Sequence, residues 1–314
     1  MDMSNPPTAR YAKVIEASKK VRWDIDADVI RGREFDYDRK FLPDGLAQAT
    51  RFAFATAQEK RFLSQVQGRT YANMFALCER FIGAKLLELT RGEALGDQAV
   101  VEALVRSTDE ELKHQALFRR LETMMAVGMP AGYDFLPEPN AVAEAVLGKS
   151  TWAVLALTCN IELFTLEHYR QSIDGDDEVS ELWKDVFFFH MKEESQHAIL
   201  DELEWARENA RLDFDRREAA LTDFIDLVGA VDGLLQMQAG ADAAYFLANI
   251  ERRLDPAHEK ALREGLLRAY RWQYIVSGAS NERFGKLLAG MLEPHQMQRV
   301  NAALAPIVAD VGTR

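Results

Sequence analysis

Two sets of glutamate and histidine residues recur in this chain with the same internal spacing. Each set consists of a glutamate, a second glutamate 32 positions later, and a histidine three positions after that. Residues three apart share one face of a helix, so each Glu-x-x-His pair directs a carboxylate and an imidazole to one point. Such side chains, converging from four helices, are typical ligands of two metal ions. The two sets are Glu79, Glu111 and His114, and Glu162, Glu194 and His197.

The first glutamate of each set stands in apolar surroundings. Glu79 shares its helical stripe with Phe75, Ile82 and Leu86, and Glu162 lies within the mostly apolar segment 155–164. A carboxylate that is buried without a partner is unfavourable by several kcal/mol or becomes protonated. Several carboxylates at one buried point are therefore stable only beside strong positive charge, which two divalent metal ions would provide.

His190 is a seventh candidate ligand. It stands four residues before Glu194 and seven before His197, so the three side chains share one helical face. His190 also follows the aromatic run 187–189, and packing within that run is the alternative role.

Two further glutamates directly precede the paired ones. Metal-bound imidazoles usually donate their second N–H to a carboxylate or carbonyl. We therefore expect Glu193 to orient His114 and Glu110 to orient His197, each across the bundle. The alternative is that both glutamates are solvated charges on the helix flank.

The remaining histidines and the cysteines have no spacing that indicates a site. His168 follows Glu162 by six residues and is expected to point away from it. His258 and His295 are expected on the surface. Cys78 and Cys159 are too few for a disulfide framework and are expected to be small core residues in a reducing cytoplasm.

Helical periodicity dominates the chain, which is expected to be all-α. The first 43 residues are expected to form an irregular arm, residues 45–210 a metal-binding bundle, and residues 211–314 an outer helical layer, all in one domain (1–314). Glycines at 68, 92 and 96 are taken as helix breaks, and 128–139 as a long crossover loop. The expected helices cover 45–67, 69–91, 97–127, a short segment near Val142, 150–173, 179–209, 216–251, 256–280 and 295–308.

Composition excludes several classes of function. The chain of 314 residues is 48% hydrophobic, which is sufficient for a large core. Its net charge of −12 argues against nucleic-acid binding. No apolar run approaches the ~20 residues that span a membrane, and the first residues do not resemble a signal peptide. A cytoplasmic location is therefore expected.

Residues 45–210 resemble the ferritin-like di-iron carboxylate superfamily, a four-helix bundle that would here carry additional flanking helices. The histidine one turn before the final Glu-x-x-His makes the pattern similar to the p-aminobenzoate N-oxygenase family. The resemblance implies that Glu111 and Glu194 bridge two iron ions and are central to catalysis. It further implies that one iron is bound by Glu79 and His114 and the other by Glu162, His190 and His197.

The resemblance also implies a function. Two iron ions, or a manganese–iron pair, would activate O2 to oxidise a small organic substrate, such as an amine at nitrogen. A ferredoxin or a flavin reductase would donate electrons, and the surplus helices are compatible with a homodimer. Phe118 occupies the position at which ribonucleotide reductase radical subunits have a tyrosine, so a tyrosyl radical is excluded there.

Other functions remain open from the residues alone. A C–H hydroxylase or acyl-chain desaturase would use the same metal ions. A ferritin-type iron-oxidising or storage protein would also use them, although storage chains are usually about one bundle long. A helical module whose motifs arise by chance is the remaining alternative.

Overall fold

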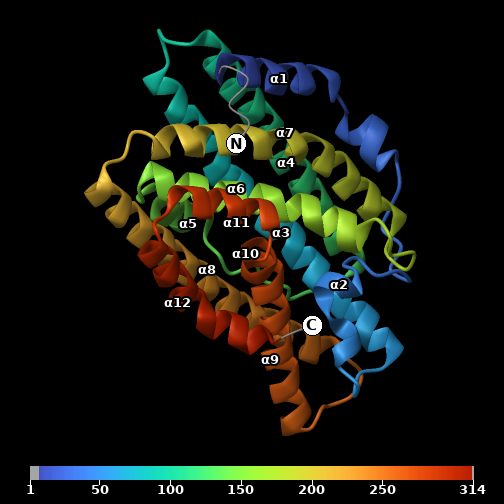
Figure 1. The fold of residues 1–314 in the computed structure, drawn as a ribbon. Coiled ribbons are helices and arrows are strands. Elements are labelled where there is room, and N and C mark those ends of the chain that lie inside the picture. Colours follow the sequence, from blue (N-terminus) through green and yellow to red (C-terminus); the bar gives the residue numbers. More distant parts are fainter. Residues whose placement is uncertain (1–6, 313–314) are drawn as a thin grey trace.

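The computed structural model describes residues 7–312, which form an all-helical protein (Figure 1). This confirms the all-α prediction at the level of secondary structure. Within the described range no strand is present, and one isolated bridge joins Lys40 to Val179. No helix between residues 7 and 312 combines the length and the apolar character needed to cross a bilayer.

Four long helices carry all the predicted ligands. α3 (Ala57–Gly92) packs against α4 (Gln98–Gly128), α6 (Thr151–His168) packs against α7 (Glu181–Asn209), and α4 also contacts α7. Thr56 and Glu59 form a reciprocal capping box at the start of α3, which satisfies two backbone N–H groups. Asp97 caps α4 through the backbone N–H of Ala99. The bounds of α4, α6 and α7 lie close to the expected ones.

The helix break predicted at Gly68 is wrong, because α3 continues through this residue. A Cβ at position 68 would stand 2.6 Å from the Cβ of Phe41, which is closer than two such atoms approach. The glycine therefore allows the segment before the bundle to lie directly on the helix. The part of the predicted first helix before Ala57 is reduced to the short helix α2 (Asp44–Ala47) and a 3-10 turn, Ala49–Arg51.

The prediction of an irregular arm over residues 1–43 is also wrong in part. Residues 1–6 lie outside the described range, but α1 (Pro7–Lys20) is a regular helix that packs on α4 and α7. A π-helical turn follows at Ile25–Ile30, capped at its start by the Asp24 carboxylate. Trp23, between these two elements, is 8% exposed, so the arm is part of the core.

The last third of the chain forms a layer on α6 and α3 (orange and red in Figure 1). After the loop 129–138 and α5 (Pro139–Leu147), the chain forms α6 and α7 and then enters this layer. An additional helix, α11, was not predicted. The layer contains α8 (Phe214–Asn249), α9 (Pro256–Arg271), a π-helical turn (Trp272–Val276), α10 (Ser277–Ala279), α11 (Glu282–Met291) and α12 (Pro294–Val311).

A buried carboxylate joins this layer to α3. Asp242 of α8 accepts hydrogen bonds from Thr70 Oγ1 at 2.6 Å, from Gln238 Nε2 at 2.9 Å and from the Tyr270 hydroxyl. Burial raises the pKa of Asp242 to about 7, although these donors work in the opposite direction. The three donors satisfy a group that would otherwise destabilise the core.

Candidate metal centre

All seven predicted ligand side chains lie in the interior, and none is more than 3% exposed. Buried carboxylates are uncommon unless they are paired or bind a metal ion. They come from four helices: Glu79 from α3, Glu111 and His114 from α4, Glu162 from α6, and His190, Glu194 and His197 from α7.

The first group of possible metal ligands contains Glu79, His114, His190 and Glu194. One ligand atom from each residue lies within 4.8 Å of all the others. Nε2 of His190 stands 3.1 Å from Glu79 Oε1 and 2.6 Å from Glu194 Oε1. Three separate helices thus meet at this point.

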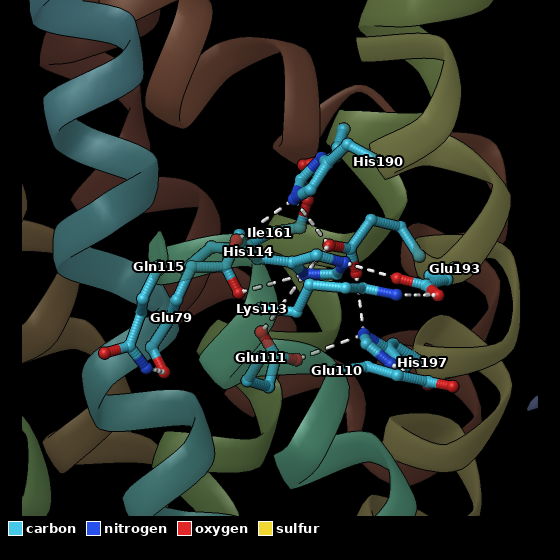
Figure 2. Close-up of polar contacts among 12 residues, drawn as sticks. Glu79, Glu110, Glu111, Lys113, His114, Gln115, Ile161, His190, Glu193 and His197 are labelled. Atoms are coloured by element: carbon cyan, nitrogen blue, oxygen red, sulfur yellow. Dashed lines mark hydrogen bonds and ion pairs between the residues drawn. The ribbon is translucent and has the colours of Figure 1, made fainter. Parts of the chain in front are cut away.

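The second group contains Glu111, His114, Glu194 and His197, again with ligand atoms within 4.8 Å of one another. Nδ1 of His197 stands 3.1 Å from Glu111 Oε1 and 2.9 Å from Glu194 Oε2. His114 and Glu194 belong to both groups, and Figure 2 shows His114 between His190 and His197. The two groups therefore adjoin, and the carboxylate of Glu194, which belongs to both, could bridge two ions.

Glu162 lies beside these groups without being a member of either. Burial, followed by the negative charge of Glu194, raises the pKa of Glu162 well above its ordinary value. A neutral Glu162 carboxyl group can donate a hydrogen bond to Glu194. Burial would raise the pKa of Glu194 as well, but the neighbouring histidines His190, His197 and His114 hold it well below its usual range.

The grouping differs from the division of ligands that the family resemblance implied. His190 stands with Glu79, whereas it was expected to accompany Glu162 and His197. The physical reason is that Nε2 of His190 lies between Glu194 Oε1, at 2.6 Å, and Glu79 Oε1 of α3, at 3.1 Å.

The three imidazoles respond differently to the same environment. Burial disfavours a positive charge on each ring. At His114 the carboxylates of Glu194, Glu111 and Glu193 outweigh burial and raise the pKa well above its ordinary value. Carboxylates also raise the pKa of His197. At His190 burial prevails, with help from the charge of His114, and the pKa is lowered.

Several polar atoms at the centre have no hydrogen-bond partner among residues 7–312. Since more than nine in ten buried polar groups in proteins are paired, such a cluster requires an explanation. Each of these atoms is a type that binds iron or manganese. The donor set therefore fits a pair of metal ions. The unpaired atoms that could bind such ions are Glu79 Oε2, both carboxylate oxygens of Glu111 and Nδ1 of His114.

Glu193 stands where it was expected to hold His114. Its Oε2 lies 2.9 Å from Nε2 of His114, and its Oε1 accepts a hydrogen bond from Lys113 Nζ at 2.5 Å (Figure 2). The Lys113 ammonium group in turn stands 3.9 Å from the ring centre of Trp23, whose indole stacks on His114 at 6.0 Å. The N-terminal arm therefore covers this side of the centre.

Glu110 has the equivalent position at His197. Its Oε2 lies 2.9 Å from Nε2 of His197 and also accepts a hydrogen bond from Gln196. Ser18 of α1 donates to the other oxygen at 2.7 Å. Neither Glu110 nor Glu193 is solvated, since both are at most 2% exposed. The expected contacts exist, and their role at a bound metal ion stays a prediction.

Aromatic rings enclose the side of the centre near His190. The rings of Phe75 and Phe118 meet the His190 imidazole edge to face, with ring centres 5.3 and 5.0 Å away. Phe187 completes this wall at 6.0 Å. These rings keep water from the ligand atoms.

The other histidines lie away from both groups. His168 is buried, but its two ring nitrogens contact the hydroxyl groups of Tyr71 and Ser277 at 2.8 Å. His258 and His295 are partly exposed, with side chains 45% and 53% accessible, and each lies beside a carboxylate. Tyr71 is therefore a structural partner of His168 in this structure.

Residues outside the ligand motifs complete the centre, and sequence reasoning missed them. Trp23, Lys113 and Ser18 support the two outer glutamates as described above. Asp201 is a further buried carboxylate on α7, and burial raises its pKa to about 7. Asp201 follows His197 by four residues, a spacing that could have indicated it. Nothing in the local sequence links Trp23 to His114.

Comparisons of the chain with models of known families, with curated proteins and with solved structures found no significant match. The chemical interpretation of the centre therefore depends on its own residues.

Proposed function

We propose that this protein is a di-iron oxygenase built on a ferritin-like four-helix bundle. Two helical hairpins, α3–α4 and α6–α7, supply the ligands, and a long connection containing α5 joins them. This order of elements supports the ferritin-like assignment, since one long crossover is typical of that fold. The helices outside the bundle would be additions to it.

The observation that carries the proposal is the pair of adjoining ligand groups with unpaired buried atoms. Four carboxylates (Glu79, Glu111, Glu162 and Glu194) would balance the charge of two divalent ions. Three imidazoles would complete the ligand set, and Glu111 and Glu194 are the candidates for bridging carboxylates. Two reduced iron ions would supply electrons to dioxygen.

The chain's own residues would position and protect the reactants. Glu193 and Glu110 hold the rings of His114 and His197 by their outer nitrogens, which leaves each Nδ1 directed at the carboxylates. The aromatic wall around His190 excludes water, which would otherwise compete with the substrate. We propose oxidation of an amine at nitrogen as the reaction, with electrons from a ferredoxin or a flavin reductase.

A second candidate is oxidation of a C–H bond, as in a hydroxylase or desaturase. It is favoured by an apolar cavity whose lining includes Cys78 and Ile161, the residues directly before Glu79 and Glu162, because this cavity would accept a hydrocarbon chain. The metal ligands do not distinguish the two reactions.

Anaerobic loading with ferrous iron, followed by 18O2 and mass spectrometry of a panel of aryl amines, alkyl amines and acyl chains, tests the proposal. We expect about two iron ions per chain and 18O in an amine product. Labelling of a C–H position would select the second candidate. Uptake of many iron ions per chain without substrate oxidation would indicate a storage protein. Glu194→Ala serves as the control, since it removes a residue common to both groups.

A further inference from the structure

The apolar cavity lies between α3, α5, α6 and α8 and has a volume of about 470 Å³. Tyr274, from the π-helical turn after α9, also forms part of its wall. Pockets for small organic molecules usually measure about 300–1,000 Å³. The cavity is therefore large enough to enclose such a molecule.

The inner wall of the cavity belongs to the same helical turns as two predicted ligands. Cys78 directly precedes Glu79 on α3, and Ile161 directly precedes Glu162 on α6 (Figure 2 draws Ile161 with the centre). The inner end of the cavity therefore adjoins the helical turns that carry these two predicted ligands.

The outer end of the cavity opens between α5 and α8. Its lining there includes three small residues, and all three are exposed: Ala141 and Ala145 on α5, and Ala230 on α8. A molecule could enter at this end without displacing a large side chain.

The lining is almost entirely apolar, and its charged groups already have partners. The Glu138 carboxylate accepts hydrogen bonds from the backbone N–H groups of Asn140 and Ala141. Lys149 Nζ pairs with Asp226 Oδ2 at 2.8 Å. Glu138, Lys149 and Asp226 together carry one negative charge, which disfavours the binding of an anion. An unpaired charge of either sign within the apolar part would be poorly solvated.

One polar group in the wall has no partner. The Tyr274 hydroxyl is buried and makes no hydrogen bond among residues 7–312. Its ring packs on Tyr71 and Tyr270, with ring centres 5.9 and 6.1 Å away, so the side chain is held in place. The hydroxyl oxygen itself has almost no accessible surface, so the Tyr274 ring, and not its hydroxyl group, forms this part of the wall.

We propose that this cavity binds the substrate, and that the substrate is an uncharged, mainly apolar molecule. The assignment of the bound molecule as the substrate rests on the proposed function. Among amines, an aryl amine fits better than an alkyl amine, because only the aryl amine is uncharged at neutral pH.

Calorimetric titration of the full-length protein with four matched probes tests the ligand class. The probes are 4-hexylaniline, hexylbenzene, 4-hexylbenzoate and hexylammonium. We expect the two uncharged probes to bind at least tenfold more tightly than the two charged ones. Equally tight binding of either charged probe would overturn the proposal.

Variants at the mouth of the cavity test the location. Ala145→Trp and Ala230→Trp place a large side chain at exposed positions, so the fold should persist and probe binding should be lost. Ala219→Trp, at an exposed position of α8 outside the cavity lining, is the matched control. Unchanged binding in both mouth variants would refute the site.

The two proposals can fail separately. If the protein bound the probes as expected but took up no iron, the oxygenase function would be refuted. The cavity would then be a binding site for an uncharged molecule that the protein does not oxidise. Iron-dependent O2 consumption without binding of the uncharged probes would refute the ligand class alone.

Discussion

His114 of α4 and Glu193 of α7 face each other across the protein interior, with Nε2 of the imidazole 2.9 Å from Oε2 of the carboxylate. This contact fixes the ring so that Nδ1 points to the carboxylates of Glu194 and Glu79, at 3.1 and 3.5 Å. Since Lys113 binds the other oxygen of Glu193, the carboxylate itself is also held. The orientation of His114 therefore depends on a residue that would not touch the metal ion.

Replacing Glu193 with alanine should weaken metal binding while the fold is retained. Loss of such a partner commonly lowers metal affinity by about 10- to 100-fold. Titration with ferrous iron or cobalt would measure the effect. Glu181→Ala, at an exposed position of the same helix, is the control and should bind as the unmodified chain does. Equal affinity in the two variants would contradict the orienting role.

Two ligand variants should differ in the number of ions lost. His190 belongs to one ligand group, whereas Glu194 belongs to both. We expect His190→Ala to retain one tightly bound ion per chain and Glu194→Ala to retain none. Equilibrium dialysis with elemental analysis gives these numbers, with the exposed His295→Ala as the control. If His190→Ala bound as many ions per chain as the unmodified protein, His190 would be a packing residue and not a metal ligand.

The buried Asp242 should make stability depend on pH. Burial raises its pKa from 3.8 to about 7, so the folded chain binds more protons than the unfolded chain between these values. This contribution is complete below about pH 4 and is lost as the pH rises to about 7. Between pH 5 and pH 8 the unmodified chain should lose about 3 kcal/mol through this group.

Asp242→Asn removes that titration. Its free energy of unfolding, relative to that of the unmodified chain, should therefore increase from pH 5 to pH 8. Urea denaturation at the two pH values measures this change, and the exposed Asp215→Asn on the same helix is the control. Suppose instead that the free energies of unfolding of Asp242→Asn and the unmodified chain differ by the same amount at both pH values. That result would show that Asp242 does not titrate in this range.

Two helical glycines should respond oppositely to replacement by alanine. Gly68→Ala would bring its Cβ within 2.6 Å of Phe41, so we expect a loss of about 1–3 kcal/mol despite the better helix propensity. Gly229→Ala, in the middle of α8 with no atom near the new Cβ, should stabilise the protein by about 0.5–1 kcal/mol. Thermal denaturation of both variants compares them directly. If Gly68→Ala stabilised the protein, α3 and the segment that contains Phe41 would be able to move apart without loss of stability.

The sequence was sufficient to predict the helical class and most helix bounds, because apolar periodicity and capping residues are local signals. It also indicated which side chains to examine. Six of the seven predicted ligands fall into the two groups, and Glu162 is buried beside them. Their binding of metal stays a prediction.

What could not be predicted depends on distant contacts. A glycine within a helical pattern commonly indicates a helix break. Only the position of Phe41 shows that Gly68 instead allows another segment to pack closely on α3. Trp23 lies in a polar stretch, and its stacking on His114 joins positions far apart in the chain. The placement of His190 beside Glu79 depends on side-chain geometry that a spacing rule does not contain.

The contact between Trp23 and His114 has a consequence for biosynthesis. α1 packs on both α4 and α7, so the surface that receives this helix is incomplete until the ribosome has passed Asn209. Helix α1 therefore cannot complete its packing until α7 has been synthesised. Any metal ion delivered before that moment would enter a pocket still open to bulk water on the side that the indole later seals.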